Sequence, residues 1–411
     1  DDGAAPTGGS DASAIPPMIT SFSIGSIPKI LFGAGRVKEL PGLAAQYGHR
    51  LVLVTGQRSF RASAAGEALD RALSAQGLFA RVVTIPGEPS PDEVDLLVRD
   101  LRKDAFDVVI GIGGGSVLDA AKAIAGLLSV ECSVMDYLEG VGPEKPYQGP
   151  STPFIAVPTT AGTGSEATRN AVLTRQGVNG FKKSFRDDAL MARYAVVDPD
   201  LLAGCPRPLI AANGMDALTQ LLESYVSLRA NPMTDALALS GISAVSRGLL
   251  AWFHGEDEPQ SRSEMAYAAL LSGICLAQAG LGSVHGLAQP LGSFFPIGHG
   301  VVCGTLLAEA TAVNLEAMAR RDPEHSQRAK YAHAARIFLD RPNLEDESAL
   351  DALLVTLRSM TQTLELPRLS VLGVKWDDFD RIVAHSRGSS MQTNPVRLED
   401  AEIRTILERC Y

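Results

Sequence analysis

The chain has 411 residues, of which 45% are hydrophobic and 20% are charged, a balance typical of a folded globular protein. That length is too great for one simple core and favours two domains. The net charge of −10 argues against a nucleic-acid partner. Gly, Ser or charged residues interrupt every apolar stretch, so we expect no segment long enough to span a membrane.

Cysteine usage indicates a reducing compartment. The cysteines are widely spaced and form neither a CxxC pair nor a zinc-binding pattern. Free, mostly buried thiols in a cytoplasmic protein fit this usage best. The residues concerned are Cys132, Cys205, Cys275, Cys303 and Cys410.

Residues 1–19 are expected to form a disordered tail. The opening sequence, DDGAAPTGGSDASAIPP, is small, polar and rich in Gly and Pro, so it cannot bury a core. It contains neither the basic stretch nor the apolar stretch that marks a secretory signal.

From about residue 20 to 205, short β-branched runs that end in Gly, Pro or Asp alternate with amphipathic helical segments. This alternation predicts an α/β domain with a parallel sheet covered by helices on both faces. In such sheets, ligands bind at the C-terminal ends of the strands. The expected strands are 50–56, 79–87, 106–115, 153–162 and 194–199, and the expected helices are 63–77 and 90–104.

After about residue 206 the strand pattern fades and helical patterns follow one another. We therefore expect an α-helical domain over residues 206–411, with the junction at Gly204-Cys205-Pro206. No internal repeat of fixed period is present. The helices expected most clearly are 206–228, 231–253, 262–280 and 347–366.

One glycine-rich motif predicts a phosphate site. In FDVVIGIGGGSVLDAAKAIA, an expected strand runs through Gly113, Gly114, Gly115 and Ser116 into a helix expected to begin near Val117. Consecutive glycines let backbone N–H groups approach a pyrophosphate, and the helix N-terminus adds positive partial charge. The spacing is not that of GxGxxG, and a tight structural turn is the alternative. The strand, glycine turn and helix together favour phosphate binding.

A second polar motif, PTTAGTGSEAT, occupies residues 158–168 at the end of an expected strand. Its Thr159, Thr160 and Thr163 offer hydroxyls suited to ribose or pyrophosphate, although an ordinary polar loop would look the same. Lys182 and Lys183 follow and could reach into the same cleft. A solvated charge pair is the alternative for the two lysines.

A third group of residues predicts a metal site. Asp216 and Gln220 lie one turn apart on the expected helix face of NGMDALTQLLESYVS. His285 and His299 lie in GLGSVHGLAQPLGSFFPIGHG, which we expect to form a Gly-rich turn that converges on that face. The set is typical of a divalent metal site in which one ligand is Gln. A single His is more often a core residue, so the spacing alone leaves both interpretations open.

Seven ordered motifs resemble the iron-containing (group III) alcohol dehydrogenase family over about residues 20–411. They are GGGSVLDAAKAIA, PTTAGTGSEAT, AVVDPDLL, GMDALTQLLESYVS, GLGSVHGLAQPLG, PIGHG and SSMQTNPVRL. The resemblance implies a dinucleotide-binding α/β domain, a helical domain and an active-site cleft between them, the architecture shared with dehydroquinate synthases. It implies hydride transfer between NAD or NADP and a small alcohol, aldehyde, ketone or oxoacid, in a homo-oligomer such as a dimer.

The resemblance also implies a cofactor site. NAD-preferring relatives often carry Asp after the first strand, where this chain has Gly56, Gln57, Arg58 and Ser59. Loss of the acid removes a repulsion and Arg58 could pair with a 2′-phosphate, so NADP is permitted. A surface Arg is the alternative. The cofactor residues by position are Gly56, Gln57, Arg58, Gly113, Gly114, Gly115, Ser116, Asp119, Thr159, Thr160, Thr163, Lys182 and Leu201.

The family's metal ligands fall on Asp216, Gln220, His285 and His299. The family usually has His at position 220, and often a further His at position 289, where this chain has Gln289. Amide oxygen is a weaker donor to Fe or Zn than imidazole nitrogen, whereas Mg or Mn tolerate it better. The site is therefore expected to hold a metal with Gln220 or water as fourth ligand, to hold it weakly, or to hold none.

Without a metal, another group must stabilise the developing alkoxide. His285 is the first candidate and Lys182 the second, with Gln289 beside the nicotinamide. The chain also resembles the maleylacetate reductases, which look like carbonyl reducers that do not rely on metal.

Two other functions stay open. A dehydroquinate-synthase-like lyase shares the expected architecture, but it needs more Lys, Arg and His around a phosphate-bearing substrate than the helical half shows. The second open function is a nucleotide-binding protein that has lost catalysis. Gln220 and Gln289 suggest it, because both stand where the family usually or often has His.

Overall fold

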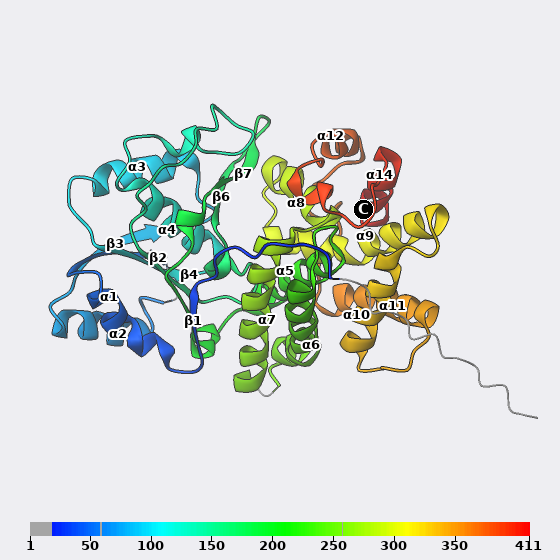
Figure 1. Cartoon of the computed structure of the whole chain (residues 1–411), viewed down its shortest axis with the longest axis horizontal. Coiled ribbons are helices and arrows are strands. Elements are labelled where there is room, and N and C mark those ends of the chain that lie inside the picture. Colours follow the sequence, from blue (N-terminus) through cyan, green and yellow to red (C-terminus); the bar gives the residue numbers. More distant parts are fainter. Residues whose placement is uncertain (1–18, 58–59, 257) are drawn as a thin grey trace, which may run out of the picture.

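The computed structural model describes residues 19–57, 60–256 and 258–411 (Figure 1). The expected tail lies outside the described residues apart from residue 19. Arg58, on which the NADP expectation rests, also lies outside them.

The first part of the chain forms a parallel sheet in the strand order β1-β8-β5-β4-β2-β3, and β6 and β7 form a separate antiparallel pair. The elements are β1 (Lys29–Phe32), α1 (Leu40–Ala45), β2 (Arg50–Gly56), α2 (Ala64–Ala75), β3 (Phe79–Ile85), α3 (Pro91–Leu101), β4 (Val108–Gly113), α4 (Gly115–Leu127), β5 (Phe154–Pro158), β6 (Asn170–Arg175), β7 (Phe181–Arg186) and β8 (Tyr194–Val197).

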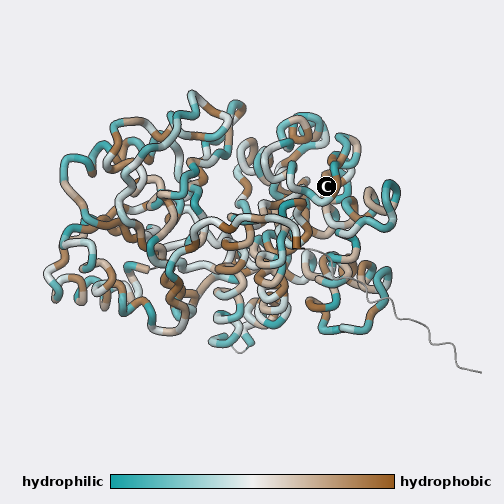
Figure 2. The backbone as a smooth tube through the Cα atoms, in the orientation of Figure 1, coloured by the Kyte–Doolittle hydropathy of each residue, from teal (hydrophilic) through white to brown (hydrophobic). Residues whose placement is uncertain are grey.

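Helices cover both faces of this sheet because neighbouring strand residues point to opposite sides. In β2, Leu51 and Leu53 pack with α1 and α2, whereas Val52 and Val54 pack with α3 and α4. Figure 2 shows the hydrophobic stretches of the chain gathered on the inner strands and hydrophilic ones along the outer loops. The expectation of a parallel sheet covered on both faces is confirmed.

Each expected strand corresponds to a strand of the sheet, and β2 has the expected bounds. Two features were missed. The short edge strand β1 has only four residues, and the β6–β7 hairpin carries many charged and polar residues that weaken its pattern. Strand β1 depends for its pairing on β8, which is distant in the sequence, whereas β6 and β7 pair with each other and were missed because of their polar composition.

The second part of the chain is helical. Between β8 and α5 there is a short 3-10 turn, η5 (Pro199–Leu202), so the change from strands to helices falls close to the expected junction. The helices are α5 (Arg207–Val226), α6 (Pro232–His254), α7 (Glu258–Ala279), α8 (Ser283–Phe294), α9 (His299–Arg321), α10 (Ser326–Leu339), α11 (Asp346–Thr363), α12 (Phe379–Ala384), α13 (Ser389–Gln392) and α14 (Asp400–Arg409).

The expectation that no segment is long enough to span a membrane is wrong on length and composition. Helices α6 and α9 are both long and apolar enough, and α7 with α8 would qualify as a bent pair. In α9, 83% of the apolar window is buried inside the protein. Its apolar side chains therefore serve the helical core, where they pack against α5 and α11.

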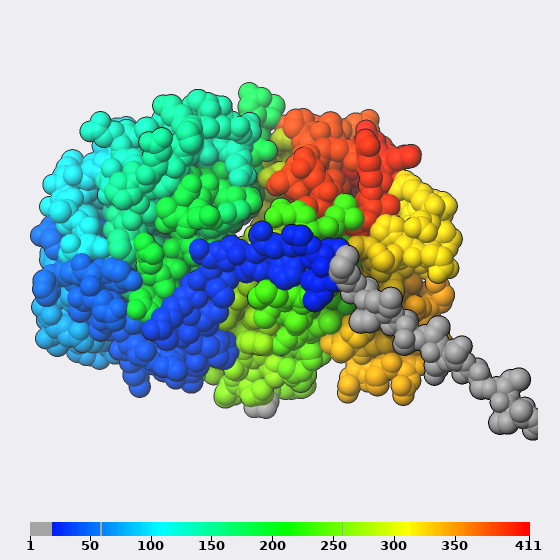
Figure 3. All heavy atoms as spheres, in the orientation of Figure 1, coloured from blue at the N-terminus to red at the C-terminus, as the bar shows by residue number. Residues whose placement is uncertain are grey.

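The segment that precedes β1 crosses the surface between the two parts. Figure 3 shows it in blue, running from the helical side to the sheet side. The Gly25 N–H donates to Oε1 of Gln278 on α7 at 2.7 Å, which ties the segment to the helices.

Candidate active site

The glycine motif forms the turn between the central strand β4 and helix α4. Gly113 closes the strand and Gly115 opens the helix, so the helix begins two residues earlier than expected. In the described part of the chain, no side chain caps the first turn of α4. Its backbone N–H groups are therefore available to an anion. Strand β2 lies beside β4 where the strand order reverses, the usual place for a dinucleotide.

The threonine-rich loop packs directly on this turn. The Thr159 N–H donates to the Gly113 carbonyl at 2.9 Å. A Cβ at Gly115 would lie 2.7 Å from Cγ2 of Thr163, and one at Gly114 would lie 3.3 Å from Thr160. Only glycine lets the two segments approach this closely. The two expected cofactor motifs thus form one surface.

A buried lysine that sequence reasoning missed holds this surface together. Lys122 on α4 is fully buried, and its Nζ lies 2.8 Å from the Ser165 carbonyl and 2.9 Å from Oγ1 of Thr168. Ser165 in turn donates to Oδ1 of Asp119 at 2.6 Å. Burial lowers the pKa of Lys122 to about 8. The signal was present in the sequence, because Asp119 and Lys122 are the charged residues of an otherwise apolar helix.

A cleft lies between the sheet and the helices and encloses about 1080 Å³ of space, part of it open to solvent. It is lined by the N-terminal end of α4, one face of the β6–β7 hairpin, and residues of α5, α8 and α9. The expected site residues in its lining are Gly115, Ser116, Asp119, Thr163, Lys182, Gln220, His285, Gln289 and His299.

Several expected cofactor residues do not line this cleft. Gly56 ends β2 beside the first turn of α4, where an added Cβ would lie 3.7 Å from Cγ2 of Val117, and Gln57 follows it on the surface. Leu201 lies on η5 and packs against the core between the sheet, α1 and α2. The others, Gly113, Gly114, Thr159 and Thr160, form the turn behind the lining residues.

The two lysines of β7 point to opposite faces of the hairpin. Lys182 faces the cleft, where its Nζ lies 3.0 Å from Oε1 of Glu88. Lys183 does not reach the cleft, since its Nζ lies beside Gly140 instead. The expectation for Lys183 is therefore wrong, because successive strand residues alternate between faces.

Glu88 is a second residue that sequence reasoning missed. Besides Lys182 it contacts Thr174, whose hydroxyl donates to Oε2 at 2.9 Å. Burial opposes ionisation of Glu88, but Lys182 and the hydrogen bonds outweigh it and hold the pKa of the carboxyl below its usual value. An ionised carboxylate therefore faces the cleft beside Lys182.

Asp216, His285 and His299 converge at the inner end of the cleft. Oδ1 of Asp216 lies 3.3 Å from Nε2 of His285 and 3.6 Å from Nε2 of His299. The expected Gly-rich turn is wrong, because His285 lies within α8 and His299 is the first residue of α9. Gly282 and Gly298 are the N-cap residues of the two helices, and other glycines of that stretch lie inside them.

Cys303 lies in the same cluster, one turn after His299 on α9. Its Sγ is 3.7 Å from Nε2 of His285 and 3.7 Å from Nε2 of His299. Donor atoms of Asp216, both histidines and Cys303 all lie within 4.8 Å of one another. The i, i+4 spacing from His299 was the sequence signal for this residue. Burial raises the pKa of its thiol to about 12, although His285 beside it opposes the shift.

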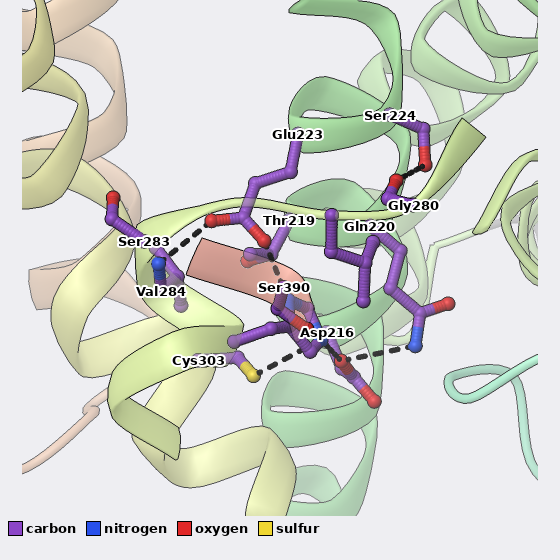
Figure 4. A network of polar contacts seen from close by, with 12 residues as sticks. Asp216, Thr219, Gln220, Glu223, Ser224, Gly280, Ser283, Val284, Cys303 and Ser390 are labelled. Atoms are coloured by element: carbon purple, nitrogen blue, oxygen red, sulfur yellow. Dashed lines mark hydrogen bonds and ion pairs between the residues drawn. The ribbon is translucent and has the colours of Figure 1, made fainter. Parts of the chain in front are cut away.

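Gln220 also reaches Asp216, but through its nitrogen. Its Nε2 lies 3.4 Å from Oδ1 of Asp216 (Figure 4). Its Oε1 accepts from Ser272 at 2.7 Å. The amide thus presents a donor to the carboxylate.

Glu223 fixes the orientation of His285. Its Oε2 lies 2.7 Å from Nδ1 of the imidazole, and its Oε1 accepts from the Val284 N–H at 2.7 Å. Nε2 of His285 therefore faces Asp216. Although burial opposes the charged ring, the thiol of Cys303 and the carboxylates hold the pKa of His285 well above its ordinary value.

The cluster fits a divalent cation. Oδ2 of Asp216, on the carboxylate that faces both imidazoles, is buried and finds no hydrogen-bond partner among the described residues. Burial opposes the ionised form of Asp216, yet the two histidines outweigh it and lower the pKa of its carboxyl. Burial lowers the pKa of His299 to about 4, so this imidazole is neutral. A carboxylate and neutral imidazole are the donors that transition metals prefer.

Comparison with known proteins gives matches over both parts of the chain. The sequence model of iron-containing alcohol dehydrogenase matches residues 28–199, and that of the family's C-terminal region matches residues 210–411. Alcohol dehydrogenase 4 of Saccharomyces cerevisiae (strain YJM789) is 31% identical over 397 residues, which cover 96% of this chain and 99% of the yeast protein.

Solved structures of related dehydrogenases and reductases match the fold over nearly the whole chain. A 1,3-propanediol oxidoreductase superposes with a TM-score of 0.85 at 29% identity, covering 95% of this chain and 100% of the other. Sulfoacetaldehyde reductase from Bifidobacterium kashiwanohense in complex with NAD+ superposes with a TM-score of 0.81 at 27% identity, covering 95% and 99%.

These matches extend over nearly the whole chain and do not favour the lyase alternative. They agree with the turn at α4 and with the cluster around Asp216, which are suited to a nicotinamide dinucleotide and a divalent metal. The chain belongs to the iron-containing alcohol dehydrogenase family and is an NAD(P)-dependent oxidoreductase of alcohols and carbonyl compounds.

Proposed function

We propose that this protein interconverts a small aldehyde, ketone or oxoacid and its alcohol in the cleft between the sheet and the helices. One observation carries this proposal. His285 and His299, which contact Asp216, line the same cleft as Gly115 and Ser116 at the start of α4. A dinucleotide bound along α4 would bring its reactive end to the metal cluster.

The cofactor contacts follow from the two motifs. We assign the pyrophosphate to the uncapped first turn of α4, where the N–H groups and the helix dipole favour anions. Lys182 and Gln289 line the cleft with His285, and we place the nicotinamide end there. Gln289 cannot release a proton, so its role is a hydrogen bond to the nicotinamide carboxamide.

Asp216, His285 and His299 would hold the metal, and a bound divalent cation supplies Lewis acidity toward the substrate oxygen. Glu223 keeps Nε2 of His285 facing Asp216. In the reducing direction, bound NAD(P)H would supply a hydride to the carbonyl carbon, and the oxygen would take a proton from solvent. Lys182 provides positive charge in the cleft as negative charge develops on that oxygen.

We extend the proposal to the division of the chain, with a dinucleotide-binding domain over residues 20–205 and a metal and substrate domain over residues 206–411. The end of β8 at Val197 and the start of α5 at Arg207 support that division. We also propose a cytoplasmic homo-oligomer, at least a dimer. All the cysteines are free thiols, and Ile19, Phe22 and Ile27 expose apolar side chains available to an interface.

The test combines metal analysis with turnover. The protein is purified without chelator, its metal content is measured, and oxidation of NADH and of NADPH is followed over a panel of small carbonyl compounds before and after EDTA. Near-stoichiometric Fe or Zn with EDTA-sensitive turnover is the expected result. EDTA-insensitive turnover without metal would instead make His285, with its raised pKa, the group that polarises the carbonyl.

Binding of NAD(P)H without turnover of any carbonyl compound would contradict the proposal. That outcome would support a nucleotide-binding protein that has lost catalysis.

A further inference from the structure

The metal cluster has one weak position, Gln220. Its amide nitrogen faces Oδ1 of Asp216, and its oxygen is engaged by the Ser272 hydroxyl. Serving as a ligand would require the amide to turn over and exchange both contacts. Amide oxygen is also a poor donor to Fe or Zn. The chain therefore needs another fourth donor if it binds either metal at this site.

Cys303 has the position such a donor requires. A tetrahedral metal bound at ordinary distances separates a thiolate sulfur from an imidazole nitrogen by about 3.6 Å, and a carboxylate oxygen from an imidazole nitrogen by about 3.4 Å. The observed separations are 3.7 Å from Sγ to each Nε2. They are 3.3 and 3.6 Å from Oδ1 of Asp216 to the two histidines. Four of the six donor-to-donor separations thus match those that a bound metal requires, and the other two, Asp216 to Cys303 and His285 to His299, are within 4.8 Å.

The helix α9 explains why the thiol points here. His299 and Cys303 are four residues apart, so they share one helix face. Figure 4 shows Cys303 and Gln220 on opposite sides of Asp216 in that view. Cys275 and Cys410, the other fully buried cysteines, instead contact backbone carbonyls of Thr234 and Thr305. Cys303 is the cysteine whose described hydrogen-bond partners are imidazole nitrogens.

We propose that Cys303 is a metal ligand and forms, with Asp216, His285 and His299, a four-donor site that does not depend on Gln220. When the cation binds, the Cys303 thiol releases its proton to solvent and a sulfur–metal bond forms without any change of oxidation state. A thiolate makes the site softer and favours Zn or Fe over Mg or Mn. The inference rests on the proposed metal site but not on turnover.

The test uses cobalt(II) as a spectroscopic probe in the absence of NAD(P)H and substrate. Chelator-treated protein is loaded with cobalt(II), bound cobalt is measured by elemental analysis, and the thiolate-to-cobalt absorption is recorded in the near ultraviolet. The expected result is that the wild-type protein, Gln220→Ala and the matched control Cys275→Ala all show the band. Cys303→Ala should lose the band and bind cobalt at least about tenfold more weakly.

A band that persists in Cys303→Ala, its absence from the cobalt-loaded wild type, or failure of the wild type to bind cobalt would each overturn the inference. Should Cys303→Ala not fold, X-ray absorption of the zinc-loaded wild type tests the inference instead. We expect one sulfur atom among the nearest neighbours of the zinc. A zinc site without sulfur would overturn the inference. Cobalt binding is read without catalysis, so an inactive enzyme that shows the band would contradict only the proposed function.

Discussion

Glu223 and His285 are joined on the side of the imidazole that faces away from Asp216, with 2.7 Å between Oε2 and Nδ1. The other carboxylate oxygen accepts from the Val284 N–H, so both oxygens of Glu223 are used on α8. The carboxylate therefore determines which nitrogen of His285 faces the metal cluster. Such partners of a metal ligand matter almost as much as the ligand itself.

Glu223→Gln should reduce metal affinity or turnover by about 10- to 100-fold, because an amide accepts more weakly from Nδ1 and can turn its NH2 group toward the ring. Metal content after dialysis and kcat/KM for carbonyl reduction measure the change. Glu264→Gln is the matched control, since Glu264 pairs with Arg247 at the surface of the helices. Equal metal retention in the two variants would show that Glu223 does not orient His285.

Gly115→Ala should abolish or strongly weaken NAD(P)H binding. The new Cβ would lie 2.7 Å from Cγ2 of Thr163, so the loop must move away from the first turn of α4. Fluorescence titration with NADH measures the loss, which we expect to exceed tenfold in Kd. Gly42→Ala is the control, because a Cβ there meets nothing within 4 Å. Unchanged affinity in Gly115→Ala would place the cofactor elsewhere.

Lys182→Met should raise the KM for the cofactor or lower kcat by at least about tenfold, because it removes the positive charge that faces the cleft beside Glu88. Lys183→Met makes the same change on the opposite face of the hairpin and should leave the kinetics unchanged. Steady-state kinetics with each cofactor distinguish the two. A similar loss in both variants would mean that charge on the hairpin matters rather than position in the cleft.

Both parts of the fold were predictable where local pattern and tertiary environment agree. The strand at residues 50–56 is apolar on both faces because helices cover both, and its bounds are those of β2. The hairpin was not predictable, since Lys182 and its neighbours resemble a charged loop until the strand pairs. Sequence motifs likewise placed Asp216 and the histidines together. They did not show that α9 turns Cys303 toward them or that Ser272 holds Gln220 away.

Lys122 and Glu166 are two further residues whose burial could not be predicted from the sequence. The structure buries both, Lys122 on α4 and Glu166 within the threonine-rich loop, where a charged residue is costly unless it is paired. The sequence pattern marks Lys122 as an exception in an apolar helix, but only the fold supplies the loop oxygens that it contacts.

Glu166 provides a pH test of this buried region. Burial raises the pKa of its carboxyl from 4.5 to about 7, whereas Lys122 stays charged up to a pKa of about 8. Between about pH 4.5 and 7 the folded chain therefore holds a proton that the unfolded chain releases. The unfolding free energy should fall through this window as pH rises and then level off.

At about 1.4 kcal/mol for each unit of pKa, the contribution of Glu166 to that fall is about 3 kcal/mol. Glu166→Gln removes the titration, so the difference in unfolding free energy between wild type and variant should shrink or change sign from pH 5 to pH 7.5. Denaturant unfolding of both proteins at the two pH values measures it, with Glu347→Gln, on an exposed part of α11, as the control. A pH-independent difference would mean that Glu166 is ionised throughout and that Lys122 neutralises it inside the fold.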